Sequence, residues 1–138
     1  MRFMIMVRAN ADSEAEVMPS KQLIAQMADY HEELAKAGAL LDASGLEPSS
    51  RGWRIRYSGA NRTVVDGPYA ESKELIAGYT IIDVKSKEEA LEWTKRFPNP
   101  FPNSREAEIE VRPLMSLDQL GESEGVERFR ELSVRSQK

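Results

Sequence analysis

The fold is decided by residues 76–93, which read IAGYTIIDVKSKEEALEW. Residues 76–84 have the composition of a strand and carry apolar side chains at both odd and even positions. Because successive side chains of a strand point to opposite faces, one face carries Tyr79 and Ile81, and the other carries Ile76, Thr80, Ile82 and Val84. The pattern predicts a strand that is covered on both faces.

A helix is predicted directly after this strand. Ser86 and Glu89 have the spacing of a capping box, with Ser86 as the N-cap and Glu89 at the third helical position. Pro98 ends the helix, because proline cannot continue its hydrogen bonding. The residues that supply its buried side are Ala90, Leu91, Trp93, Thr94 and Phe97.

The beginning of the chain repeats this arrangement. Residues 3–7 are apolar on both faces, and residues 9–18 predict a loop or a loose turn. A helix is predicted at about 20–37, because Pro19 and Ser20 suit a helix start and Gly38 suits a helix end. Its apolar stripe is Leu23, Ile24, Met27, Ala28, Leu34 and Ala35.

The remaining strands are shorter. Small and apolar residues at 39–46 lead into a turn-rich stretch, and residues 53–57 then alternate apolar and basic side chains. This predicts that residues 39–46 and 53–57 form a hairpin with one solvated face. A second turn at 58–61 leads into a short strand at 62–65. Residues 107–112 alternate again and predict a last strand.

These elements predict an α+β fold. Their order favours a ferredoxin-like sandwich, in which an antiparallel sheet carries helices on one face, over residues 1–113. The charged extension 114–138 has apolar residues at roughly helical spacing and predicts one or two short helices. The uncovered face of the strands at 3–7 and 76–84 predicts a homodimer that packs sheet on sheet, because monomers rarely expose so large an apolar patch.

Composition excludes several classes of protein. The chain has 138 residues, a mass of 15.6 kDa and a formal charge of -4, which argues for a single domain and against a nucleic-acid partner. The absence of cysteine excludes disulfides and thiolate zinc sites and fits a cytoplasmic protein. No apolar run approaches the roughly 20 residues of a membrane span, so we expect no membrane association. With no cysteine, one histidine and scattered carboxylates, we expect no bound metal, and no motif predicts a cofactor.

His31 is the only histidine and therefore the only source of imidazole chemistry. It follows Met27 by four residues and precedes Leu34 by three, which places it on or beside the apolar stripe of the first predicted helix. A histidine at such a position is either a structural group with satisfied hydrogen bonds or a catalytic or ligand-binding group. Position alone leaves both interpretations open.

The loop DGPYAESKE at residues 66–74 is the second candidate site. In the structural interpretation, Asp66 and Gly67 form a tight turn, Pro68 directs the exit of the chain, and the charges are solvated. In the chemical interpretation, a carboxylate from this loop lies beside an imidazole, orients its tautomer and raises its basicity.

This loop also carries a family resemblance. Together with Ala77-Gly78-Tyr79 and Asp83-Val84 it resembles the signature of the YCII-related, or DGPF-domain, family. Further similarities lie at residues 31–34, 37–41, 45–46 and 89–93, so the resemblance extends over residues 1–113. It implies a ferredoxin-like dimeric α+β barrel with a cleft that holds a histidine and an aspartate, and no settled reaction.

The resemblance also implies roles for individual residues. His31 and Asp66 become the catalytic pair, and the substrate-binding residues become Arg8, Tyr69, Lys73 and Tyr79. Tyr69 stands where the family motif has phenylalanine and adds a hydroxyl. Asp42 or Ser44 on the second strand are alternative polar partners for His31.

Three functions follow from these residues. An enzyme would use His31 as general acid or base, Asp66 to orient it, and Arg8 or Lys73 as counter-charge for a small anionic substrate. A ligand-binding or regulatory module would use the same cleft without turnover, and the resemblance implies a link to transcription control, since family members are often encoded beside sigma factors. A haem protein would use His31 as axial ligand, although no other residue points to haem.

Overall fold

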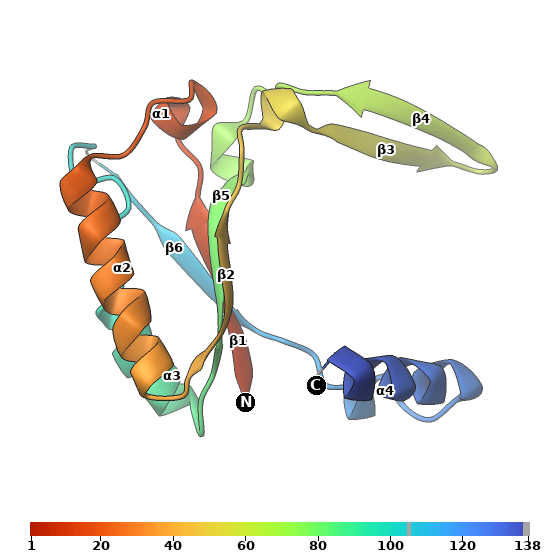
Figure 1. Cartoon of the computed structure of the whole chain (residues 1–138). Coiled ribbons are helices and arrows are strands. Elements are labelled where there is room, and N and C mark those ends of the chain that lie inside the picture. The colour runs from red at the N-terminus through yellow and green to blue at the C-terminus, as the bar shows by residue number, and fades with distance from the viewer. Residues whose placement is uncertain (105, 137–138) are drawn as a thin grey trace.

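The computed structural model describes residues 1–104 and 106–136. Its centre is a four-stranded antiparallel sheet with the order β2-β5-β1-β6. The strands are β1 (Arg2–Arg8), β2 (Leu40–Gly45), β5 (Ile76–Asp83) and β6 (Ile109–Pro113). Helices α2 (Lys21–Lys36) and α3 (Lys87–Lys95) cover one face of this sheet (Figure 1), so the chain has a mixed α+β fold.

The core lies between this sheet and the two helices. Ile5, Leu34 and Ile82 are fully buried there, and Thr80 is the buried polar residue beside them. Strand β5 thus points Thr80 and Ile82 to the helices, and Tyr79 and Ile81 to the opposite face, as the alternation in the sequence predicts.

Helix α2 begins and ends near the expected residues, but it presents a different stripe to the core. Ser20 caps the helix by accepting a hydrogen bond from the backbone N–H of Leu23 at 3.1 Å. Tyr30 is buried, whereas Ile24 is 50% exposed, and Ala28 and Ala35 are also exposed. The predicted stripe was wrong at these positions because Tyr30 packs edge-on against Trp93 of α3 and against Phe97, which follows α3, and this turns the Tyr30 side of the helix inward.

The segment expected to be a loop contains a helical turn, α1 (Ala11–Glu14). Asn10 accepts a hydrogen bond from the N–H of Ser13 at 2.9 Å, and the Ser13 hydroxyl accepts one from the N–H of Asn10 at 3.0 Å. This reciprocal capping stabilises a short helix that has no apolar stripe. The prediction of a loop over 9–18 was therefore wrong at 11–14.

A two-stranded hairpin extends away from the sheet. Its strands are β3 (Trp53–Ser58) and β4 (Asn61–Asp66), and the short helix η1 (Ser49–Arg51) precedes them. The prediction that residues 39–46 form a hairpin with 53–57 was wrong, because β2 pairs with β5 and β3 pairs with β4. The sequence predicts one solvated face for 53–57, whereas every residue of β3 is exposed. The hairpin projects past the end of the sheet instead of packing on it (Figure 1).

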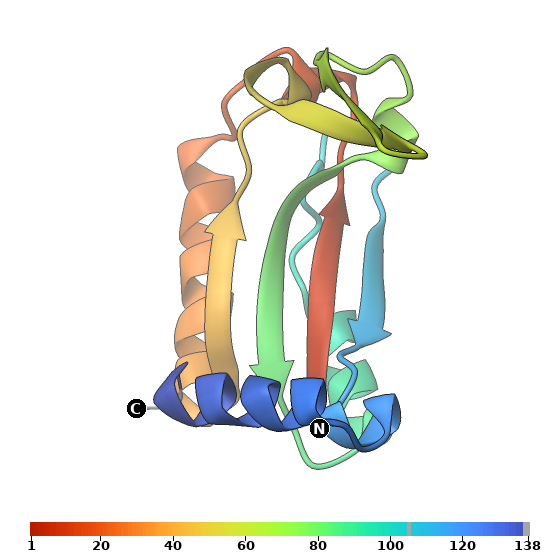
Figure 2. The same cartoon turned by 90° about the vertical axis from the view of Figure 1, so that its right-hand side faces the viewer.

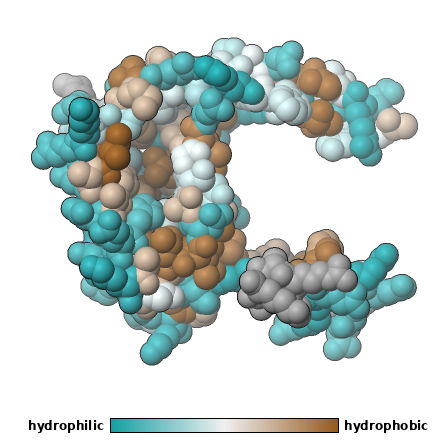
Figure 3. Space-filling view, in the orientation of Figure 1, coloured by the Kyte–Doolittle hydropathy of each residue, from teal (hydrophilic) through white to brown (hydrophobic). Residues whose placement is uncertain are grey.

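The end of the chain forms a second projection. After β6 come η3 (Leu117–Leu120) and helix α4 (Glu124–Ser136). Helix α4 lies across the lower end of the sheet, on the same side as the hairpin (Figures 1 and 2). The space-filling view shows a wide hollow between the two projections (Figure 3). In the part of the chain that the structure describes, no helix combines the length and apolar composition needed to cross a membrane.

Candidate functional site

His31 bridges helix α2 and strand β5. Its Nδ1 lies 2.7 Å from the carbonyl oxygen of Met27, and because a carbonyl only accepts, Nδ1 carries the hydrogen and donates it. Its Nε2 lies 2.8 Å from Oγ1 of Thr80 and accepts from that hydroxyl. Both ring nitrogens are therefore engaged within the chain, in the geometry of a structural histidine.

The structure does not join His31 to Asp66. Asp66 ends strand β4 and is exposed, and no hydrogen bond or ion pair holds its carboxylate within the described residues. The residue that sequence reasoning missed is Thr80, which occupies the position assigned to a carboxylate. The signal was present in the sequence, because Thr80 is the one hydroxyl on the otherwise apolar face formed with Ile76, Ile82 and Val84.

Asp42 and Ser44 lie on the other side of the sheet from His31. The Tyr79 hydroxyl donates to Oδ2 of Asp42 at 3.1 Å, and Ser44 pairs with Tyr79 in the strand register. Since Tyr79 and Thr80 are consecutive residues of a strand, they point to opposite faces. The sheet thus separates both residues from His31, and the prediction that either is its partner was wrong.

The loop at residues 66–74 holds the hairpin in place. The chain at Gly67 passes so close to η1 that a Cβ there would lie 1.9 Å from the Ser49 carbonyl oxygen. The Gly67 N–H donates to the Gly52 carbonyl at 3.1 Å. Glycine is required at this crossing because any side chain would collide with backbone.

Tyr69 has a structural position in the same loop. Its backbone N–H donates to Oγ of Ser49 at 3.1 Å, and its hydroxyl donates to the carbonyl of Val65 at 2.8 Å. The guanidinium of Arg54 lies 3.6 Å from the centroid of its ring. These contacts occupy both the hydroxyl and one ring face of Tyr69 within the hairpin.

The face of the sheet away from α2 and α3, here called the open face, carries a polar cluster. Arg8 donates to Glu110 at 2.9 Å, lies 3.8 Å from Glu108, and donates a further hydrogen bond to the carbonyl of Lys73. Two strands away, Asp42 accepts from Tyr79. The apolar side chains between these polar groups are Met4, Met6 and Ile81.

The Tyr79 hydroxyl acts as a hydrogen-bond donor. Its hydrogen bond to the Asp42 carboxylate, together with the negative charge of that group, raises the pKa of Tyr79 above its ordinary value of 10.0. The phenol therefore stays protonated across the physiological range. It can bind a ligand or hold Asp42 in position, but it is a poor base.

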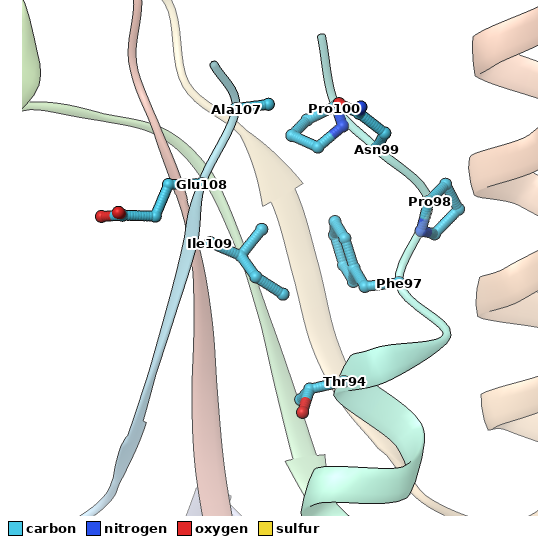
Figure 4. A pocket seen from close by; sticks show the side chains of 8 residues that line it. All are labelled: Thr94, Phe97, Pro98, Asn99, Pro100, Ala107, Glu108 and Ile109. Atoms are coloured by element: carbon cyan, nitrogen blue, oxygen red, sulfur yellow. The ribbon is translucent and has the colours of Figure 1, made fainter. Parts of the chain in front are cut away.

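Two cavities lie on the helix side of the sheet, along strand β6. One has a volume of about 250 Å³ and lies between β6 and the chain that leaves α3, with Phe97 and Ile109 on its wall and Glu108 pointing away from it (Figure 4). The other, of about 420 Å³, is lined mainly by apolar residues of β1, α3 and β6, including Phe3, Leu91 and Val111. None of the predicted site residues lines either cavity. Among the described residues no group of three or more acidic or histidine side chains could hold a metal ion.

A family model for the YCII-related domain matches residues 1–116. The chain belongs to the YCII-related domain family. An uncharacterized protein of Rhizobium meliloti (strain 1021) is 31% identical to this YCII-related protein over 94 residues, which are 68% of this chain and 74% of that protein. The family match ends at residue 116, so η3 and α4 lie beyond it.

Among solved structures, this YCII-related protein aligns with 5-chloro-2-hydroxyhydroquinone dehydrochlorinase from Burkholderia phenoliruptrix AC1100, in complex with 2,5-dihydroxybenzoquinone. The alignment has a TM-score of 0.44 and 13% sequence identity, and it covers 83% of this chain and 94% of that one.

Proposed function

We propose that this YCII-related protein is a homodimer that binds a small molecule on the open face of its sheet, between the two copies. The observation that carries the proposal is the presence of two polar groups, Arg8 with Glu110 and Asp42 with Tyr79, on a face that no part of the described chain covers. Polar side chains placed among apolar ones in a concave surface are typical of ligand sites.

The open face of the sheet supports the homodimer. Met4, Met6 and Ile81 are half-exposed at the centre of the open face, and a second copy would remove them from water. The core order of strand, helix, two strands, helix and strand, with the β3–β4 hairpin inserted, supports the proposal of a ferredoxin-like fold. Two such sheets packed face to face form a dimeric α+β barrel, and the polar cluster lies inside it.

The chemistry of the cluster suggests the class of ligand. The Asp42 carboxylate accepts hydrogen bonds from a hydroxyl, and Met6 and Ile81 contact an apolar body. The Lys73 carbonyl accepts from Arg8, which brings Lys73 to this end of the face, and because Arg8 pairs with Glu110, Lys73 is the cation left to attract a negative group. The ligand is therefore a small anion with an apolar body and a hydroxyl group.

Binding without turnover fits this site better than acid–base catalysis. Catalysis by His31 and Asp66 would require His31 to give up its hydrogen bond with Met27 or Thr80, and Asp66 to reach the freed nitrogen. Tyr79 keeps its proton and is a weak base. We therefore favour a ligand-binding module, with a regulatory role in the cytoplasm, over the enzyme.

The test uses 4-hydroxybenzoate as probe, because it combines a carboxylate, an apolar ring and a hydroxyl. Saturation-transfer difference NMR with the whole protein measures its binding. We expect a signal that Asp42→Asn and Lys73→Gln each reduce several-fold. The matched controls Asp29→Asn and Lys85→Gln, which replace exposed charges elsewhere, should leave it unchanged. A signal that is absent, or that Asp42→Asn and Lys73→Gln do not reduce, would contradict the proposed site.

A further inference from the structure

Two projections extend from opposite ends of the open face and on the same side of it (Figures 1 and 2). We call residues 53–66 the hairpin arm and residues 117–136 the C-terminal arm. Both expose large apolar side chains in the single chain. On the hairpin arm these are Trp53, Ile55, Tyr57 and Val64, and on the C-terminal arm they are Leu120, Phe129 and Leu132.

The hairpin arm lacks a packing surface within its own chain. Trp53, Ile55 and Val64 share one face of the hairpin, because Trp53 pairs with Asp66 and Ile55 with Val64. Trp53 is 66% exposed and Val64 is 63% exposed. An isolated two-stranded hairpin is at best marginally stable in water. This surface therefore needs a partner.

The C-terminal arm is only partly packed. Val126 is buried, and Arg130 joins α4 to η3 through Asp118 at 2.8 Å. Phe129 and Leu132 continue the stripe of Val126 at intervals of three residues, and each is 57% exposed. Half of an amphipathic stripe is thus buried against η3, and the other half is exposed.

The charges of the two arms are complementary. The hairpin arm contains three arginines and one aspartate. The C-terminal arm contains five acidic residues and three arginines. Contact between a hairpin arm and a C-terminal arm is therefore attractive, whereas contact between two arms of the same kind is repulsive.

We propose that the C-terminal arm of one copy packs against the hairpin arm of a second copy, and that the contact is made twice in the dimer. A two-fold axis that lies between two facing sheets and runs across the strands exchanges the two ends of the sheet. It brings the α4 end of one copy to the hairpin end of the other. An axis along the strands would pair arms of like charge. The inference rests on the homodimer proposed above and adds the residues that orient it.

The two contacts would close both ends of the space between the sheets. The ligand site would then be incomplete in a single chain, because the partner supplies its end walls. Since residues 117–136 lie beyond the family match, this interface belongs to chains that carry such an extension.

Disulfide trapping tests the pairing of the arms, because the chain has no cysteine of its own. Val64→Cys lies on the hairpin arm and Phe129→Cys on the C-terminal arm. We expect mild oxidation of an equimolar mixture of the two single variants to give a disulfide-linked dimer on a non-reducing gel. Each variant alone should give several-fold less, as should Gln22→Cys on the exposed side of α2 mixed with either one.

Other results would overturn the proposal. Efficient linkage of Phe129→Cys to itself would show that the α4 helices meet each other, and linkage of Val64→Cys to itself would show the same for the hairpins. Absence of linkage both in the mixture and in a second pair, Tyr57→Cys with Leu132→Cys, would also contradict it. If sedimentation still shows a dimer in that case, only the pairing of the arms fails, whereas a monomer would remove the homodimer as well.

Discussion

At the residue scale, the hydrogen bonds of His31 have the most direct consequences. The imidazole donates to Met27 within its own helix and accepts from Thr80 on the sheet, so the half-buried His31 and the buried Thr80 connect two elements. Because both ring nitrogens have hydrogen-bond partners, folding does not incur the free-energy cost of a buried polar atom without a hydrogen bond. The same bonds set the tautomer of the ring.

Replacing Thr80 with valine tests this arrangement. Thr80→Val keeps the shape of the side chain and removes the hydroxyl, so we expect a loss of about 1–3 kcal/mol in the free energy of unfolding. In the native protein, ¹⁵N spectra of the single imidazole should show hydrogen on Nδ1, and Thr80→Val should shift the Nε2 signal. Thr63→Val, on the exposed hairpin, should change neither the free energy of unfolding nor the Nε2 signal of His31. An Nε2–H tautomer, or an Nε2 shift in Asp66→Asn, would contradict the assignment.

Tyr30 gives the protein a predicted sensitivity to alkali. Burial raises the pKa of Tyr30 from 10.0 to about 12, and its hydroxyl donates to the Trp93 carbonyl at 2.7 Å. Between these two pH values the unfolded chain loses this proton while the native protein keeps it, so stability falls as the pH rises. Urea unfolding measures the free energy of unfolding of the native protein and of Tyr30→Phe. We expect the difference between the two free energies to be largest at pH 9 and to become progressively smaller towards pH 12. A constant difference would show that Tyr30 titrates normally in the fold.

At the element scale, the hairpin depends on a backbone crossing. Gly67 passes the carbonyl of Ser49 at a distance that leaves no space for a Cβ, and Tyr69 adds two hydrogen bonds at the same junction. The loop that resembles a catalytic motif in the sequence thus has a clear structural role in this chain. It sets the angle at which the hairpin leaves the fold.

Gly67→Ala tests that role. The added methyl group would force η1 and the loop apart, so we expect a loss of roughly 1–3 kcal/mol in stability or a displaced hairpin. Gly45→Ala is the matched control, because a Cβ at Gly45 meets no atom within 4 Å. Thermal unfolding followed by circular dichroism compares the two variants. Equal melting temperatures would contradict the close crossing at Gly67.

Local rules account for the elements that the sequence predicts well. The faces of β5 follow from the strict alternation of a strand, and the ends of α2 follow from Ser20 and Gly38, which act on the adjacent backbone. The rotation of α2 depends on Tyr30 meeting Trp93 and Phe97, far along the chain. The partner of His31 is likewise 49 residues away, so neither could be read from local spacing.

At the scale of the whole molecule, the open face of the sheet is the main feature to explain. The hairpin and α4 project from the two ends of the sheet, on the same side, and leave this face uncovered between them (Figure 3). A small monomer gains little from two projections that expose apolar side chains to water. Each of these features has an explanation if a second copy occupies the space between the projections.

Sedimentation equilibrium of the full chain at micromolar concentration tests the homodimer most directly. For a homodimer we expect a mass of about twice 15.6 kDa. Met6→Asp, which places a charge at the centre of the open face, should shift the equilibrium towards the monomer, and Gln22→Asp on the exposed side of α2 should not. A native protein that sediments at 15.6 kDa would contradict the dimer and, with it, the ligand site between two sheets.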